Sequence, residues 1–133
     1  MTHTKFGRFG LALLSVLFPT LALADSAQGL WRTEPTDQGY LEVSIAPCQG
    51  GALCGTILRA RDQAGREQPY PHTGRQMIWA MMPEGEGQWG DGRIWDPRND
   101  RTFNSRMETR GDNLVVSGCV MGICQRQQWQ RVN

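Results

Sequence analysis

Four cysteines are the side chains best suited to chemistry in this sequence of 133 residues. They form two close pairs along the chain, and they are Cys48, Cys54, Cys119 and Cys124. A structural zinc site favours tighter pairs with a histidine nearby, and these pairs have neither. An even number of cysteines in a short exported chain is typical of disulfides. The sequence therefore predicts two disulfides and no metal site.

The other polar residues do not suggest an active site, because an enzyme needs a nucleophile, a base or a metal within mutual reach. His72 lies between Pro71 and Thr73 in the longest expected loop, Asp62 to Thr73, where a lone histidine is usually solvated. The serines lack a G-x-S-x-G elbow. Asp91 and Asp96 lie close in sequence, but turns favour aspartate for backbone reasons. A glycosidase-like carboxylate pair remains an open alternative. We expect no catalytic residue and no cofactor.

The first 24 residues have the layout of a secretory signal peptide. Lys5 and Arg8 precede an apolar run from Phe9 to Leu23, which ends in the small-x-small pattern Ala22-Leu23-Ala24. A membrane anchor is the alternative, but the run is short and contains a proline. We expect cleavage after Ala24, a single domain over residues 25–133, and a periplasmic or secreted protein. No later stretch is long and apolar enough to span a bilayer.

The charge of the mature chain argues against a nucleic-acid partner. Removing Lys5 and Arg8 from the 14 basic side chains leaves 12 against 13 acidic ones, so the net charge is close to −1. All the remaining basic residues are arginines. Arginine pairs bidentately and stacks on aromatic rings, and the chain offers five tryptophans for that purpose.

Short strands broken by glycine, proline, asparagine and aspartate predict an all-β fold. Tyr40 to Ala46 alternates apolar and polar residues, as in a half-buried strand. Further strands are expected around Trp31 and over Leu53–Arg61, Gly92–Trp95, Thr102–Thr109, Leu114–Val120 and Cys124–Val132. Their spacing and short turns predict a small antiparallel up-and-down barrel of seven to eight strands.

The meander also predicts how the cysteines pair. In principle three pairings are possible. With eight strands, Cys48 and Cys54 flank the second connection, whereas Cys119 and Cys124 flank the seventh. These connections lie at opposite ends of an up-and-down barrel, too far apart for a cross-pair, since bridged Cα atoms lie within about 7 Å. We therefore expect the local pairs Cys48–Cys54 and Cys119–Cys124.

Several segments resemble the domain-of-unknown-function 2147 family. The motifs are Gly29-Leu30-Trp31-Arg32-Thr33, Pro47-Cys48 with Leu53-Cys54-Gly55, Gly92-Arg93-Ile94-Trp95-Asp96-Pro97 with Thr102-Phe103-Asn104-Ser105, and Gly118-Cys119, Cys124, Gln128-Trp129 and Arg131-Val132. The resemblance covers most of the mature chain and implies a small exported protein with a lipocalin-like or calycin-like barrel. It implies no settled activity. The segment from Arg61 to Pro83 departs from the family's pattern.

One further likeness concerns the closure of the barrel. Lipocalins carry G-x-W on their first strand, with an arginine from the end of the chain over the tryptophan. Gly29-Leu30-Trp31 and Arg131 are similar in type and place. The resemblance implies that Trp31 plugs one barrel end and that Arg131 stacks on its indole. An ordinary core tryptophan beside a surface arginine is the alternative.

One apolar cluster lacks a clean strand pattern and is our candidate ligand site. It consists of Met77, Ile78, Trp79, Met81 and Met82. Methionine adapts to varied apolar surfaces, so this cluster could line a pocket for a small apolar, lipid-like ligand. The simpler alternative is a slightly irregular core strand. The second hypothesis for the whole protein is an envelope interaction module with a filled barrel and an unknown protein partner.

Overall fold

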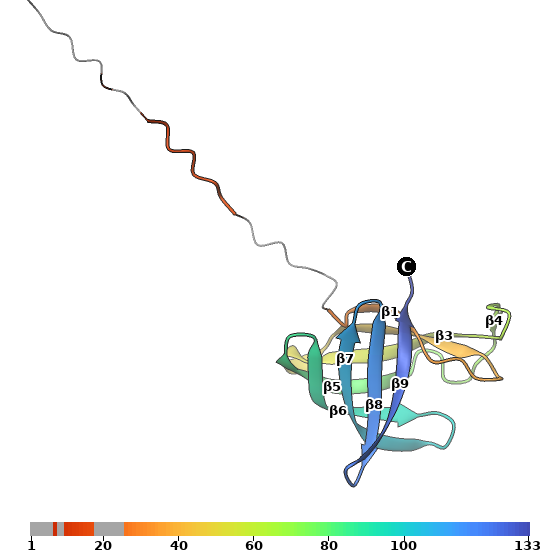
Figure 1. Ribbon diagram of the computed structural model, residues 1–133. Coiled ribbons are helices and arrows are strands. Elements are labelled where there is room, and N and C mark those ends of the chain that lie inside the picture. The colour runs from red at the N-terminus through yellow and green to blue at the C-terminus, as the bar shows by residue number, and fades with distance from the viewer. Residues whose placement is uncertain (1–6, 8–9, 18–25) are drawn as a thin grey trace, which may run out of the picture.

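The computed structural model describes residue 7, residues 10–17 and residues 26–133 (Figure 1). The expected cleavage point after Ala24 lies outside the described residues. Residues 10–17 form no regular secondary structure, and their leucines are exposed. The folded domain begins with residues 26–28, which lead directly into the first strand.

The domain is built almost entirely of antiparallel strands, as predicted. They are β1 (Gly29–Arg32), β2 (Tyr40–Pro47), β3 (Leu53–Arg61), β4 (Glu67–Gln68), β5 (Gln76–Gly85), β6 (Gln88–Asp96), β7 (Arg101–Arg110), β8 (Asn113–Val120) and β9 (Ile123–Arg131). Eight of them follow one another around a ring, and β1 closes it by pairing with both β2 and β9. The two-residue β4 pairs with β3 alone. The expected up-and-down barrel is therefore confirmed, with eight strands.

Register shifts between several strand pairs and one additional short strand distinguish the barrel from a regular meander. The cluster at residues 77–82 is the first part of β5, and its pairing with β3 shifts register twice, between Leu53 and Gly55 and between Gly55 and Thr56. Each shift places additional β5 residues opposite fewer β3 residues and bends the strand. The polar stretch expected to be the longest loop, residues 62–73, contains β4.

Both disulfides join the ends of a single hairpin. Cys48 pairs with Cys54 across the β2–β3 connection, which contains a short 3-10 turn (Gln49–Gly51), and Cys119 pairs with Cys124 between β8 and β9. These are the local pairs that the meander predicts. Such short closed loops are each expected to stabilise the domain by about 2 kcal/mol.

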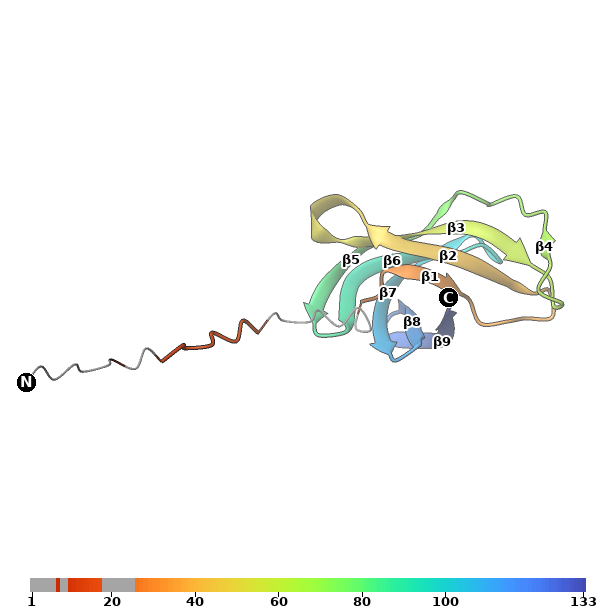
Figure 2. The ribbon, with the colours of Figure 1, turned by 90° about the horizontal axis from the view of Figure 1, so that it is seen from above.

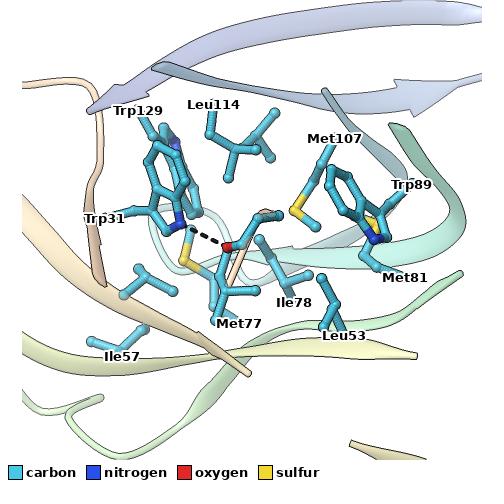
Figure 3. Close-up of a cluster of buried hydrophobic side chains, with 14 of the residues drawn as sticks. Trp31, Leu53, Ile57, Met77, Ile78, Met81, Trp89, Met107, Leu114 and Trp129 are labelled. Atoms are coloured by element: carbon cyan, nitrogen blue, oxygen red, sulfur yellow. Dashed lines mark hydrogen bonds between the residues drawn. The ribbon is translucent and has the colours of Figure 1, made fainter. Parts of the chain in front are cut away.

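The inward-facing side chains of all the larger strands meet in one apolar core (Figure 3). Trp31 and Trp129 are completely buried beside Leu114, while Met107, Trp89 and Met81 fill the part of the core farther from them in Figure 3. Burying a side chain of this size contributes about 1.5–3 kcal/mol. The core therefore supplies the main stabilisation of a domain this small.

Glu42 is a charged residue that is buried in the wall of the barrel. It lies on β2, and two arginines of β3 bind its carboxylate: Arg59 at 2.5 Å and Arg61 through its Nε. Burial alone would raise the pKa of Glu42, but the hydrogen bonds and charges of Arg61 and Arg59 outweigh it and lower the pKa below its ordinary value of 4.5. The carboxylate is therefore ionised at neutral pH.

This arrangement predicts a loss of stability in acid. Because the pKa of Glu42 is lower in the folded than in the unfolded chain, its contribution is complete above pH 4.5 and is lost as the pH falls through the folded pKa. We expect Glu42→Gln to lower the free energy of unfolding by about 1–3 kcal/mol at neutral pH. Urea unfolding at several pH values should show a smaller difference between the variant and the wild type in acid. Glu86→Gln, at an exposed turn, is the control, and an equal loss in both variants would contradict the assignment.

Candidate functional site

The two ends of the barrel differ in how they are covered. Consecutive antiparallel strands run in opposite directions, so alternate connections lie at the same end. The connections at one end, 48–52, 86–87 and 111–112, are short, and residues 26–28 lie at that end too. The connections at the other end are 33–39, 62–75, 97–100 and 121–122, and two of these are long. We call these the closed end and the open end.

Trp31 seals the closed end together with the first described residues of the domain. Its indole is fully buried, and its Nε1 donates a hydrogen bond of 2.8 Å to the carbonyl of Ala27, which is also fully buried (Figure 3). The segment before β1 therefore folds under the barrel and satisfies the polar atom of the tryptophan. A buried indole N–H without such a partner would destabilise the domain.

Arg131, at the end of β9, completes this seal. Its guanidinium lies over the Trp31 ring at 4.2 Å from the centroid and donates to the carbonyls of Ser26 and Gln28 at 2.8 and 2.9 Å. A Cβ at Gly29 would lie 2.9 Å from Nη1 of Arg131, and Gly29 has a φ of +132°. Glycine is therefore needed here both for its backbone conformation and for the arginine beside it. This is the stacking geometry that the resemblance to lipocalins implies.

At the open end, the four connections surround a cleft of about 1640 Å³. Figure 2 shows β2 and β3 on one side of the molecule and β8 and β9 on the opposite side. The two sides diverge because only two residue pairs, Trp31 with Arg131 and Arg32 with Gln130, join β1 to β9. Beyond these two pairs a gap separates β9 from the chain that follows β1, and the cleft extends into this gap, the seam of the barrel.

The first half of β9, which is nearest the open end, forms one edge of this gap. From Ile123 to Gln127 the strand pairs with β8 on one side, and no described residue forms a strand pairing with its other side. Beside that stretch, the backbone N–H of Gln128 donates at 3.0 Å to the carboxylate of Glu34. Side chains of β9 and of the connection 33–39 both line the cleft. The cleft is therefore open at the end of the barrel and also along this seam.

The strand residues that line the cleft are mainly apolar. Met77 of β5, Ile94 of β6, Phe103 of β7 and Val116 of β8 belong to four neighbouring strands. Met77 and Val116 are buried, while Ile94 and Phe103 are partly exposed to the cleft. Gly118 lies beside Ile94 and Phe103, and its missing side chain leaves room in the cleft. This wall can contact the apolar part of a ligand.

An aromatic cluster fixes one side of the rim. His72 packs edge-on against Tyr70 and Trp95, with ring centroids 5.4 and 5.0 Å apart. Arg75 covers the Trp95 ring at 3.4 Å from its centroid, and the Trp95 Nε1 donates to Asp100 at 2.8 Å. Contacts of this kind hold the connection 62–75 against the β6–β7 turn. The rim here is ordered by side-chain packing, although it carries little secondary structure.

Two ionisable groups near this cluster have shifted pKa values. Burial, and to a smaller extent the Asp96 carboxylate, raise the pKa of the Tyr70 phenol above its ordinary value. Burial alone would raise the pKa of Asp96, but hydrogen bonds from the side chain and backbone of Arg98 outweigh it and lower that pKa. At neutral pH the rim therefore presents a neutral tyrosine and an ionised Asp96–Arg98 pair.

The five residues of the candidate apolar cluster are spread over different environments. Met77 lines the cleft, Ile78 and Met81 are completely buried in the core, and Trp79 and Met82 are partly exposed outside the lining of the cleft. The structure thus brings one of the five to the cleft. A ligand-binding role for these residues stays a prediction.

The lining residues on the other strands and on the rim were not identified from the sequence. Ile94 and Phe103 lie on clean hairpin strands, whose pattern is the same whether an inward side chain packs in a core or faces a cavity. The aromatic rim residues Tyr70 and His72 lie in a proline-rich connection that resembles an ordinary loop. The one signal in the sequence is the pair of aromatic rings in Tyr70-Pro71-His72.

In residues 7, 10–17 and 26–133, no group of three or more histidine, cysteine, aspartate or glutamate side chains could hold a metal ion. Within the same residues, no helix has the length and apolar character needed to cross a bilayer.

Comparisons with known proteins agree with this fold. The family model of DUF2147, described as an uncharacterized protein conserved in bacteria, matches residues 29–131. The solved structure of a Helicobacter pylori protein that belongs to the lipocalin family is similar, with a TM-score of 0.65 and 14% sequence identity over 81% of this chain and 84% of that one. This likeness shows a shared fold. Among curated proteins, none matches the chain.

Proposed function

The chain belongs to the DUF2147 family of bacterial proteins, and from its lipocalin-like barrel we propose that it is an exported protein that binds a small apolar, lipid-like ligand. The observation that carries this proposal is the cleft of about 1640 Å³ at the open end. Eight-stranded barrels of this kind can hold one small ligand. A cleft of this size has room for a molecule as large as a lipid.

The distribution of side chains in the cleft favours a ligand with an apolar body and a polar end. The apolar body would contact Met77, Ile94, Phe103 and Val116 within the barrel. The polar end would lie at the rim, where ionised groups such as the Asp96–Arg98 pair are available. Apolar contacts supply most of the affinity in such sites, while a few polar groups fix the orientation.

Export to an oxidising compartment is part of this proposal. The leader pattern of residues 1–24 and the two disulfides support it, since disulfides persist outside the cytosol. A periplasmic or secreted carrier would keep an apolar molecule from contact with water. The hypothesis of a filled barrel becomes an outcome of the test, because the cleft of about 1640 Å³ opens next to the apolar core.

Filling the cleft from within should abolish ligand binding. A Cβ at Gly118 would lie 3.6 Å from Ile94 and from Phe103, which is ordinary contact, so a larger side chain can be added there and would extend into the cleft. We expect Gly118→Phe to weaken binding of a fluorescent fatty-acid analogue by about tenfold or more, since each 1.4 kcal/mol of lost contact is a factor of ten. A titration followed by fluorescence measures this.

The matched control is Thr102→Phe, at an exposed β7 position that does not line the cleft. This variant should bind the analogue like the wild type, and circular dichroism should show that both variants are folded. If the wild type fails to bind any apolar analogue, the barrel is not a carrier, and the interaction module becomes the better hypothesis.

A further inference from the structure

The turn between β8 and β9 exposes three apolar side chains at the rim of the cleft. Met121 is 97% exposed, Ile123 is 76% exposed and Val120 is 42% exposed. The Cys119–Cys124 disulfide links β8 and β9 one residue before and one residue after this segment. We call residues 120–123 the hairpin tip. It is a projecting apolar group on a rigid base.

The backbone conformation of the hairpin tip is unfavourable for the methionine that occupies it. Met121 and Gly122 have φ values of +51° and +81°, and the two-residue turn joins the paired Val120 and Ile123. Turns with two positive φ values favour asparagine or aspartate followed by glycine. A bulky residue such as methionine is unfavourable in this conformation. The protein thus places a strained and exposed methionine where a polar residue would be more stable.

Arginines surround the base of the hairpin tip on the outer wall of the barrel. Strand register places Arg93, Asn104, Cys119 and Cys124 in one cross-strand row. The next row contains Arg106, Ser117 and Arg126, two residues farther from the tip. Two residues of a strand span about 7 Å, and arginine side chains are long. The guanidinium groups of these rows can therefore reach toward the plane of the tip.

Two acidic groups lie at the rim of the cleft. Asp96 forms an ion pair with Arg98, whereas Asp100 accepts a hydrogen bond only from the neutral Trp95 Nε1 and keeps its charge. Arg93 donates to the neutral side chain of Asn104, so its positive charge is not compensated by that contact. Glu84 and Glu108 lie beside Arg106, Arg110 and Arg126 on this wall, and Glu108 binds Arg110. Together with Arg93, the arginines of the wall outnumber these two carboxylates, so its net charge is positive. An exposed apolar tip beside several arginines is complementary to a lipid bilayer, whose headgroups can be anionic and whose interior is apolar.

We propose that the hairpin tip is a membrane-docking element that inserts Met121 and Ile123 into the interface of an anionic lipid bilayer. The arginines on the outer wall, Arg93, Arg106 and Arg126, contact the lipid phosphates. Interfacial segments of this kind bury their apolar side chains about 5–10 Å deep while cationic groups remain at the headgroups. The disulfide holds β8 and β9 together when the tip moves from water into the bilayer.

Docking by the hairpin tip would turn the mouth of the cleft toward the bilayer. Val120, Met121 and Ile123 line the cleft as well as forming the tip. A lipid-like ligand could then pass between the bilayer and the cleft with little exposure to water. This consequence rests on the proposed function, but the docking itself does not require a bound ligand.

The test is flotation of the mature protein, residues 25–133, with lipid vesicles. We expect it to float with vesicles of phosphatidylglycerol and phosphatidylethanolamine, and much less with vesicles of phosphatidylcholine alone. High salt should weaken the first interaction, since phosphate contacts of exposed arginines are screened. Recovery of the protein only in the lipid-free fraction with both kinds of vesicle would overturn the proposal.

Met121→Asn is the decisive variant, because asparagine suits the turn and should leave the fold at least as stable. We expect its binding to anionic vesicles to fall by about tenfold or more, since a large apolar side chain then stays in water. Ile123→Thr should also bind more weakly. Leu58→Thr is its matched control, an exposed apolar strand residue of β3, and should bind like the wild type.

Further measurements separate docking from the other hypotheses. Gly118→Phe should lose the fluorescent analogue and still float with anionic vesicles, so the two proposals can fail independently. Arg93→Gln with Arg126→Gln should remove the preference for anionic lipid. If Met121→Asn floats like the wild type, or if the wild type is a dimer in solution that Met121→Asn converts to a monomer, the hairpin tip does not dock to lipid and the proposal is wrong.

Discussion

Replacing Trp31 with alanine should lower the free energy of unfolding by about 3–5 kcal/mol. The indole is completely buried, donates a hydrogen bond to Ala27 and carries the guanidinium of Arg131 on its face. Its removal leaves a cavity at the closed end and frees the segment 26–28 from the barrel. Small domains are stabilised by only about 5–15 kcal/mol, so the variant should be largely unfolded at moderate temperature.

Chemical denaturation followed by circular dichroism measures this loss. Trp79→Ala is the control, since Trp79 is only partly buried and lies at the periphery of the core. Arg131→Gln should show an intermediate loss, because it removes the stacking and the contacts with Ser26 and Gln28 but leaves the indole in place. Equal losses for Trp31→Ala and Trp79→Ala would contradict the role of Trp31 in sealing the barrel.

The second large effect is expected at Gly39, in the connection between β1 and β2. A Cβ at this position would lie 1.9 Å from the carbonyl oxygen of Arg61, and Gly39 has a φ of +107°. The obstacle is backbone, so neither side can move without shifting a strand end. We expect Gly39→Ala to lower the free energy of unfolding by about 2 kcal/mol or more.

Gly50→Ala separates the effect of the clash from that of the backbone conformation. Gly50 also has a positive φ, +66°, but a Cβ added there would have no atom within 4 Å, so only conformational strain of about 1 kcal/mol is expected. Urea midpoints of the two variants give the comparison. Equal losses would mean that the connection 33–39 does not rest on the end of β3.

The barrel and its disulfides could be predicted because their signals are local. Alternation in Tyr40–Ala46 predicts the strand, although a register shift between Glu42 and Val43 leaves both of them buried. Short turns then leave an antiparallel meander as the simplest arrangement. That arrangement then separates Cys48 and Cys54 from Cys119 and Cys124 at opposite ends. The cysteine pairing follows from it, and the expected seven to eight strands become eight because residues 77–82 are part of β5.

Strand β5 shows where sequence patterns fail. Its two register shifts against β3, and the positive φ of Ala80, interrupt the alternation, so Met77 and Ile78 are adjacent in sequence and both buried. Because a bulge adds a residue without any fixed sequence signature, periodicity cannot locate it. Sequence patterns therefore mark the apolar cluster as unusual, but they do not show which of its residues lie in the core, in the cleft or at the surface.

The cleft itself depends on long-range geometry that no local pattern records. Its width follows from the short seam between β1 and β9, which in turn depends on how far β1 extends before the chain leaves the sheet. The hairpin tip was recognisable in principle, since Met121-Gly122 occupies a turn where a polar residue is usual. Its full exposure became clear only from the structure.

Native mass spectrometry of the protein purified from its own host tests most directly whether the cleft holds a ligand. The expected result is a folded chain that carries one small molecule, recovered by lipid extraction as an apolar compound and missing from Gly118→Phe prepared in the same way. Repeated recovery of the empty chain, together with no binding of fluorescent lipid analogues, would contradict the assignment of the cleft as a ligand site.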